Sequence, residues 1–148
     1  MDNEKAIEIL NSLIEINNDR IEGYETASEE TNENDLKVLF ASFIGTSQKC
    51  KDELVKEVVS LGGEPEDGTR VSGKFFRTWM DVKAALTLKD RKAIMSSCEF
   101  GEDFAVDTYK KALEKSEHLS PEQYSMIDVQ CNQIKFDHDR VKSLRNKL

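Results

Sequence analysis

The sequence is poor in the residues that interrupt helices. Its 148 residues include only two prolines and seven glycines, and aromatic residues make up 7% of the chain. Few aromatic residues and prolines, together with abundant Glu and Lys, are typical of helical proteins. The composition therefore predicts an all-α fold, and the length suits a single domain spanning residues 1–148.

Long hydrophobic runs and excess positive charge are also missing. No uncharged apolar run approaches the about 20 residues of a membrane-spanning helix, and the amino terminus is polar and acidic, unlike a signal peptide. The chain has 21 Lys and Arg against 29 Asp and Glu, a formal net charge of −8. Because nucleic acids and anionic membranes attract clustered basic residues, we expect neither as a partner and expect a cytoplasmic protein.

Cysteine is scarce and odd in number. Cys50, Cys98 and Cys131 form no CxxC motif and fall on the predicted apolar stripes. This placement favours three small buried side chains over a disulfide set, and a redox-active role is the alternative.

The first predicted helix covers residues 2 to about 31. At 100° per residue, one stripe of this helix carries Ala6, Leu10, Leu13, Asn17, Ile21, Tyr24 and Ser28. Asn17 is the polar member near the middle of the stripe, so we expect it in the core. Asp19 and Glu22 fall on the opposite side, and we expect both to face solvent.

Four further helices are predicted from apolar periodicity and from their end signals. Two glycines at 62 and 63 stop the second helix, and Ser120 with Pro121 opens the last one. The predicted ranges, each with approximate ends, are residues 35–61, 72–86, 87–116 and 120–145. The short helix at 72–86 spans roughly 22 Å, so the connection can travel along the bundle. This predicts a four-helix bundle with a crossover between its second and third long helices.

The short helix carries an aromatic cluster that includes Trp79. Such a cluster usually covers the side or end of a bundle. The alternative is a pocket or interface formed by Trp79 with Tyr24 or Tyr109. Arg77 could cap helix carbonyls or pair with an acidic residue, and the sequence leaves both readings open.

Two pairs of apolar residues lie off the predicted core faces. Phe100 and Phe104 occupy one outer face of the third long helix, and Val129 and Phe136 occupy one of the fourth. Both pairs need a second surface to cover them. A homodimer is the favoured explanation, and packing within the chain is the alternative.

Several stretches carry a resemblance to a known family. They are residues 10–14, 22–27, 61–65, 77–81, 101–103 with Tyr109, and 134–140. Over nearly its full length the chain resembles a bacterial family of ferritin-like four-helix bundles that is catalogued as a domain of unknown function. The resemblance implies the ferritin-like arrangement with a short helix in the crossover, and it implies no activity.

Ferritin-like bundles often hold two iron or manganese ions with one Glu from each of two helices and a Glu-x-x-His pair from each of the others. This chain has only His118 and His138, and lysine stands three residues before each. Glu102, Asp137 and His138 could still hold one divalent ion between them. This reduced metal site is the alternative to a core without any cofactor.

The favoured interpretation of these inward polar residues is a hydrogen-bonded core layer. Asn17 and Gln130 would belong to it, together with the candidate metal ligands, the two core tyrosines or buried water. Glycine-rich phosphate loops and recognisable nucleophile motifs are absent from the sequence. We therefore expect a non-enzymatic structural, stress-associated or protein-interaction protein. The alternatives are a protein that binds Fe, Mn or Zn, or an oxidoreductase, and a binder of small ligands.

Overall fold

All regular structure in the described part of the chain is helical, which confirms the predicted all-α class. The computed structural model describes residues 2–68 and 73–148, and the side chains of residues 3–68 and 79–148. The elements are α1 (Asp2–Glu30), α2 (Asn34–Ser60), α3 (Gly73–Leu88), α4 (Arg91–Leu113), the short 3-10 helix η1 (Ser116–His118) and α5 (Pro121–Asn146).

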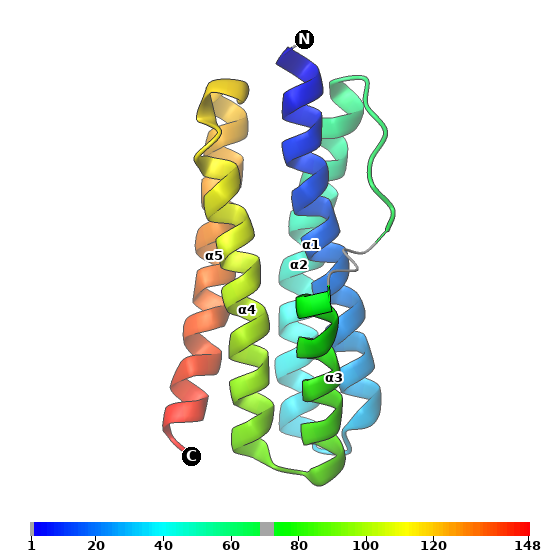
Figure 1. Ribbon diagram of the computed structural model, residues 1–148, viewed down its shortest axis with the longest axis vertical. Helices are drawn as coiled ribbons and strands as arrows, with labels where there is room; N and C mark the ends of the chain where they lie inside the picture. Colours follow the sequence, from blue (N-terminus) through cyan, green and yellow to red (C-terminus); the bar gives the residue numbers. More distant parts are fainter. Residues whose placement is uncertain (1, 69–72) are drawn as a thin grey trace.

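The four long helices form two antiparallel pairs that lie side by side (Figure 1). α1 packs along α2, α4 packs along α5, and α1 also faces α4. The shorter α3 lies against α4 and α1 in one half of the bundle, and α2 and α4 run in the same direction (Figure 1). This arrangement brings residues from all four long helices to a common interior.

The helix ends follow from local chemistry. Gly62 takes a positive φ of 82°, and the amide of Gly63 donates to the Val58 carbonyl at 3.0 Å, which closes α2. Ser120 and Gln123 form a reciprocal capping box at the start of α5, as the sequence predicts. α4 begins later than predicted because the Asp90 side chain accepts from the Ala93 amide and so fixes its start.

The apolar core consists of two clusters stacked along the bundle. One contains Leu13, Ile16, Leu54, Tyr109 and Ile134, and the other contains Tyr24, Phe40, Phe43, Cys98 and Val141, among others. On each long helix a short stretch that carries buried polar residues separates the residues of the two clusters. The apolar core is therefore interrupted at one level.

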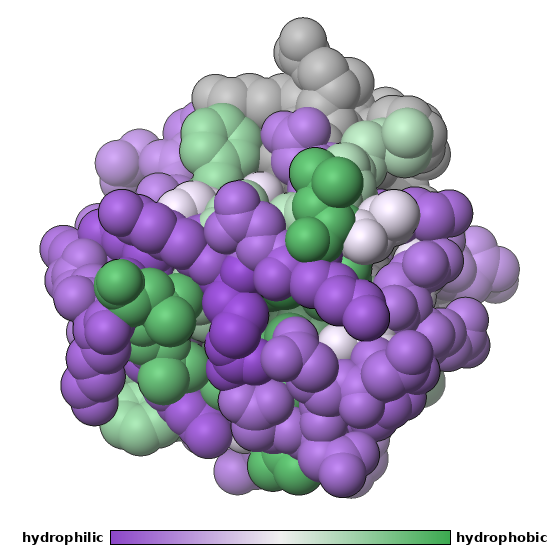
Figure 2. Space-filling view, turned by 90° about the horizontal axis from the view of Figure 1, so that it is seen from below, coloured by the Kyte–Doolittle hydropathy of each residue, from purple (hydrophilic) through white to green (hydrophobic). Residues whose placement is uncertain are grey.

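Burial confirms the predicted placement of the cysteines, since Cys50, Cys98 and Cys131 are free and buried. None of the helices that the structure describes combines the length and apolar character that crossing a bilayer requires. Figure 2 shows the end of the bundle that carries the C-terminus. That end is mostly hydrophilic, with hydrophobic side chains gathered in separate patches.

Candidate functional site

A buried arginine occupies the polar level between the two apolar clusters. Arg20 of α1 has no exposed surface. Its Nε donates to Glu102 Oε2 at 2.9 Å, and its Nη2 donates to Glu102 Oε1 at 2.6 Å. Nη2 also donates to Asp137 Oδ2 at 3.1 Å, and Nη1 donates to Ser47 Oγ at 2.5 Å. We call Arg20, Ser47, Glu102 and Asp137 the arginine layer.

Each long helix contributes one residue to the arginine layer: Arg20 from α1, Ser47 from α2, Glu102 from α4 and Asp137 from α5. All four are at most 4% exposed. The two parallel bonds between Arg20 and Glu102 are the planar, charge-assisted geometry that arginine makes with a carboxylate. The layer therefore links all four helices through one side chain.

A second polar layer, which we call the tyrosine layer, lies next to the first. Asn17 Nδ2 donates to the Tyr109 hydroxyl at 2.8 Å, and that hydroxyl donates to Gln130 Oε1 at 2.7 Å. Gln130 Nε2 continues the chain to Glu53 Oε1 at 2.9 Å. The structure thus brings Asn17, Gln130 and Tyr109 together, again across all four long helices.

Burial and charge shift the pKa values of the groups in the arginine layer. Burial alone would lower the pKa of Arg20, but the charge and hydrogen bonds of Glu102, together with Tyr24 and Asp137, outweigh burial and the net shift is upward. Burial raises the pKa of Asp137, and the neighbouring Arg20 offsets part of that rise. Burial and then the Glu102 charge raise the pKa of Tyr24 well above its usual range. Arg20 therefore stays charged, and its charge is balanced inside the core.

The three candidate metal ligands do not converge. Glu102 and Asp137 both point at Arg20, but His138 lies at the edge of the helix face. Its Nε2 is 2.5 Å from Asp103 Oδ1, and its Nδ1 is 3.1 Å from Asp139 Oδ1. Within residues 2–68 and 73–148, no group of three or more His, Cys, Asp and Glu side chains is placed to hold a metal ion. The inward position predicted for His138 is taken by Asp137, which is 4% exposed.

Trp79 and Tyr24 meet in an aromatic group beside the arginine layer. Their ring centroids lie 4.9 Å apart in an edge-to-face arrangement, and Tyr24 also packs on Phe40 and Phe43. A Cβ added at Gly23 would lie 2.3 Å from the Trp79 ring, so only glycine admits this contact. Tyr109 belongs to the other apolar cluster, and Trp79 packs against both clusters. The side chain of Arg77 lies outside the described residues.

Sequence reasoning missed the central residue of this site. Arg20 was not assigned to the core, and Asp19, expected to face solvent, is only 6% exposed; Glu22 is exposed as predicted. A signal was available, since Ile9, Leu13, Ile16 and Ala27 are all buried at helical spacing and Arg20 falls on the same stripe. A charged residue on such a stripe needs an internal partner, and Glu102 supplies it.

Comparisons with known proteins place the chain in a family. A comparison with curated proteins finds no match. One family model matches residues 5–115, which is more than half of the chain and covers most of α1 and all of α2 to α4, with Arg20, Ser47 and Glu102. The chain therefore belongs to the family described as Domain of unknown function (DUF2383).

Proposed function

We propose that this chain is a ferritin-like four-helix bundle whose role is structural or protein-binding, and in which Arg20 takes the place that a metal ion holds in metal-binding members of the wider class. In this view α3 and the segment before it form a crossover connection between the second and third long helices. The parallel directions of α2 and α4 support this topology (Figure 1).

One observation carries the proposal: the guanidinium of Arg20 is bound by two buried carboxylates, Glu102 and Asp137. A metal site at this level needs those carboxylate oxygens as ligands, because they offset the charge of the ion. Here the guanidinium of Arg20 already offsets the charge of these carboxylates. Because Arg20 does not lose its proton in the accessible pH range, a change of pH does not free the carboxylates for a metal ion.

The residues around this level do not fit a divalent metal ion. The imidazole of His138 faces Asp103, and Ser47 is a weak ligand that Arg20 already engages. A metal ion would have to displace a guanidinium whose four hydrogen bonds are buried. Displacement would leave Arg20 charged and unpaired in the apolar core, which costs several kcal/mol.

The proposal can be tested by metal analysis of the untagged protein, expressed with added iron and manganese. We expect far less than one equivalent of metal per chain. We also expect a melting temperature that neither EDTA nor added Fe, Mn or Zn changes, since a bound ligand would raise it. Retention of one or two equivalents by the parent, with loss in Glu102→Gln, would overturn the proposal.

Two variants sharpen this test. His138→Ala removes the one imidazole near the layer and is expected to leave the metal content unchanged. Asp107→Asn removes an exposed carboxylate on α4, so it reports adventitious binding by the acidic surface. If the metal content falls in Asp107→Asn but not in Glu102→Gln, the metal is bound at the surface and the proposal stands.

A further inference from the structure

One face of α5 is exposed and has the spacing of a helix-pairing stripe. Val129 and Phe136 lie on this face, seven residues apart, and are 52% and 69% exposed. The stripe continues in both directions at steps of three, four and seven residues, with every member exposed: Glu122, Ser125, Val129, Phe136, Arg140, Ser143 and Lys147. Such spacing places all of them on one side of the helix.

Beside this stripe the surface is hollowed between α2 and α5. Val129 and Phe136 line this groove together with Ser42, Gly45 and Lys49 of α2. A Cβ added at Gly45 would meet nothing within 4 Å. Small residues on α2 therefore leave room for side chains from outside to approach the two exposed apolar residues.

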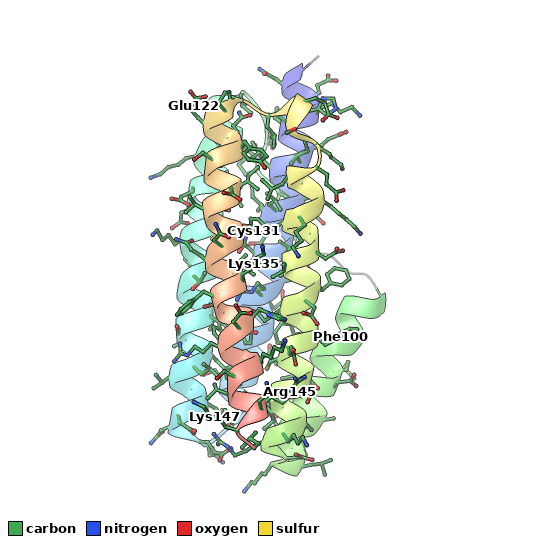
Figure 3. The ribbon with its side chains drawn as sticks, turned by 90° about the vertical axis from the view of Figure 1, so that its left-hand side faces the viewer. Phe100, Glu122, Cys131, Lys135, Arg145 and Lys147 are labelled. Carbon is green, nitrogen blue, oxygen red and sulfur yellow. The ribbon has the colours of Figure 1, made fainter. Side chains whose placement is uncertain are left out.

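The charges of α5 are separated along its length. Glu122 and Asp128 are the charged residues of its first half. Its second half has four basic residues, Lys135, Arg140, Lys142 and Arg145, against Asp137, which is buried, and Asp139, and Lys147 follows directly. Figure 3 shows Glu122 at one end of α5 and Lys147 at the other. Two copies of this helix attract when they run antiparallel, because each acidic half then faces a basic half.

We propose that the face formed by the α5 stripe and the α2–α5 groove binds a second copy of this chain, with the two α5 helices antiparallel about a two-fold axis. This inference deepens the protein-binding role proposed above and rests on it. A two-fold interface requires one patch to be complementary to itself. The stripe meets this requirement because its two apolar residues lie between ends of opposite charge.

The register follows from setting Val129 opposite Phe136 of the second copy. Glu122 then lies opposite Ser143, one helical turn from Lys147 of that copy. Arg140 lies within three residues, about 4.5 Å along the axis, of the position opposite Asp128. Asn132 falls at the axis itself, next to Gln133 of the second copy. Val129 of the second copy reaches the level of Gly45, where the groove is open.

Charge also explains why this face suits a second copy. Each chain has a net charge of −8, so two copies repel over most of their surfaces. In the antiparallel α5 pairing, basic residues of one copy lie near acidic residues of the other. A stable dimer buries about 800 Å² on each partner, more than one helix face supplies, so the exposed side of α2 must also take part.

The first test measures the mass of the full chain by sedimentation over a range of concentrations. The expected result is a species of twice 16.9 kDa that dissociates in Phe136→Glu and in Val129→Glu, while circular dichroism stays unchanged. Phe100→Glu is the matched control, since Phe100 is 47% exposed on α4 away from this face (Figure 3). A monomeric parent, or a dimer that only Phe100→Glu dissociates, overturns the inference.

Charge reversal tests the orientation. Glu122→Lys and Lys147→Glu should each weaken the dimer about tenfold, and the double variant should recover it. Parallel helices would set Glu122 against its own copy, so the single variants would then not weaken the dimer. Asn132→Cys should form a covalent dimer on oxidation, because the residue lies at the axis, and its failure to do so in a dimeric protein overturns the register.

These readouts are independent of the metal analysis. A metal-free monomer would contradict only the dimer face, whereas a dimer with stoichiometric metal would contradict the role proposed for Arg20. The two proposals can therefore fail separately.

Discussion

Arg20 and Glu102 are 82 residues apart in the chain and meet in the core through two parallel hydrogen bonds of 2.9 and 2.6 Å. Neither side chain is more than 1% exposed. A buried pair of this kind is costly to desolvate, and its net stabilisation is small compared with the cost of removing one partner. We therefore expect the pair to fix which helices meet at this level more than it adds to stability.

Arg20→Met should be strongly destabilising. The substitution leaves Glu102 and Asp137 buried without their cation, and we expect the free energy of unfolding to fall by about 3–5 kcal/mol. Urea denaturation measures the change. Lys111→Met is the control, because its ion pair with Asp107 is exposed on the surface and should contribute at most about 1 kcal/mol.

Replacing the whole ion group separates loss of a partner from loss of packing. Arg20→Met combined with Glu102→Met and Asp137→Leu should recover much of the stability, because no buried charge then remains unpaired. A triple variant less stable than Arg20→Met alone would show that the ions stabilise the fold directly.

Asp137 should give the stability a distinctive pH dependence. Because burial raises its pKa above the ordinary 3.8, the folded protein binds this proton more tightly than the unfolded chain does. The contribution of Asp137 to the free energy of unfolding is therefore greatest below pH 3.8, and it falls as the pH rises towards the pKa of the folded state. Asp137→Asn lacks this fall, so its free energy of unfolding should rise relative to the parent between pH 3 and 7.

Urea denaturation at several pH values measures this difference. Asp107→Asn is the control, because it removes an exposed carboxylate on α4 that is paired with Lys111 and not with the arginine layer. If the free energies of unfolding of Asp137→Asn and of the parent change in parallel with pH, then ionisation of Asp137 does not destabilise the folded protein and this prediction is wrong.

The sequence predicts the helices well because their signals are local. Apolar periodicity and end residues such as Ser120 and Gly62 depend on neighbours a few positions away, and they located α2 and α5 within about a residue. The start of α4 was misplaced because Thr87 and Asp90 could each cap a helix. Only the packed structure selects one of them.

The candidate site was predicted only in part, because its partners are distant in the chain. Asn17, Gln130, Glu102 and Asp137 were recognised as inward polar residues from their own helices. Arg20 was not, although it falls on an apolar stripe of α1, because the carboxylate that balances its charge is 82 residues away and periodicity cannot place it. His138 and Asp137 are adjacent, and a rotation of 100° decides which one reaches the core.

Tyr109→Phe should cost about 1–3 kcal/mol of stability. The hydroxyl of Tyr109 accepts from Asn17 and donates to Gln130, and its removal leaves both buried groups without that partner. Thermal denaturation measures the loss. Tyr124→Phe is the control, since Tyr124 is 39% exposed and should change the stability little. Equal effects in the two variants would argue against a structural role for the tyrosine layer.

The cysteines should react slowly in the folded protein. Burial raises the pKa of the Cys50 thiol to about 11 and also raises the pKa values of Cys98 and Cys131. Only the thiolate attacks a disulfide reagent, so labelling at pH 8 should be slow until urea unfolds the chain. Ser96→Cys adds an exposed thiol as an internal standard. One native thiol that labels as fast as this standard would support the redox-active alternative.

Gly23→Ala and Gly45→Ala should shift stability in opposite directions. Both positions lie inside helices, where alanine is favoured over glycine by about 1 kcal/mol. At Gly45 the new methyl group meets nothing within 4 Å of the same chain, so that gain should appear in full at low protein concentration. At Gly23 the Cβ would lie 2.3 Å from the Trp79 ring, and overpacking should cost about 1–3 kcal/mol.

The chain has a single tryptophan, so a changed emission spectrum in Gly23→Ala alone would report the displacement of α3. Equal stabilisation in both variants would mean that Trp79 does not pack on α1.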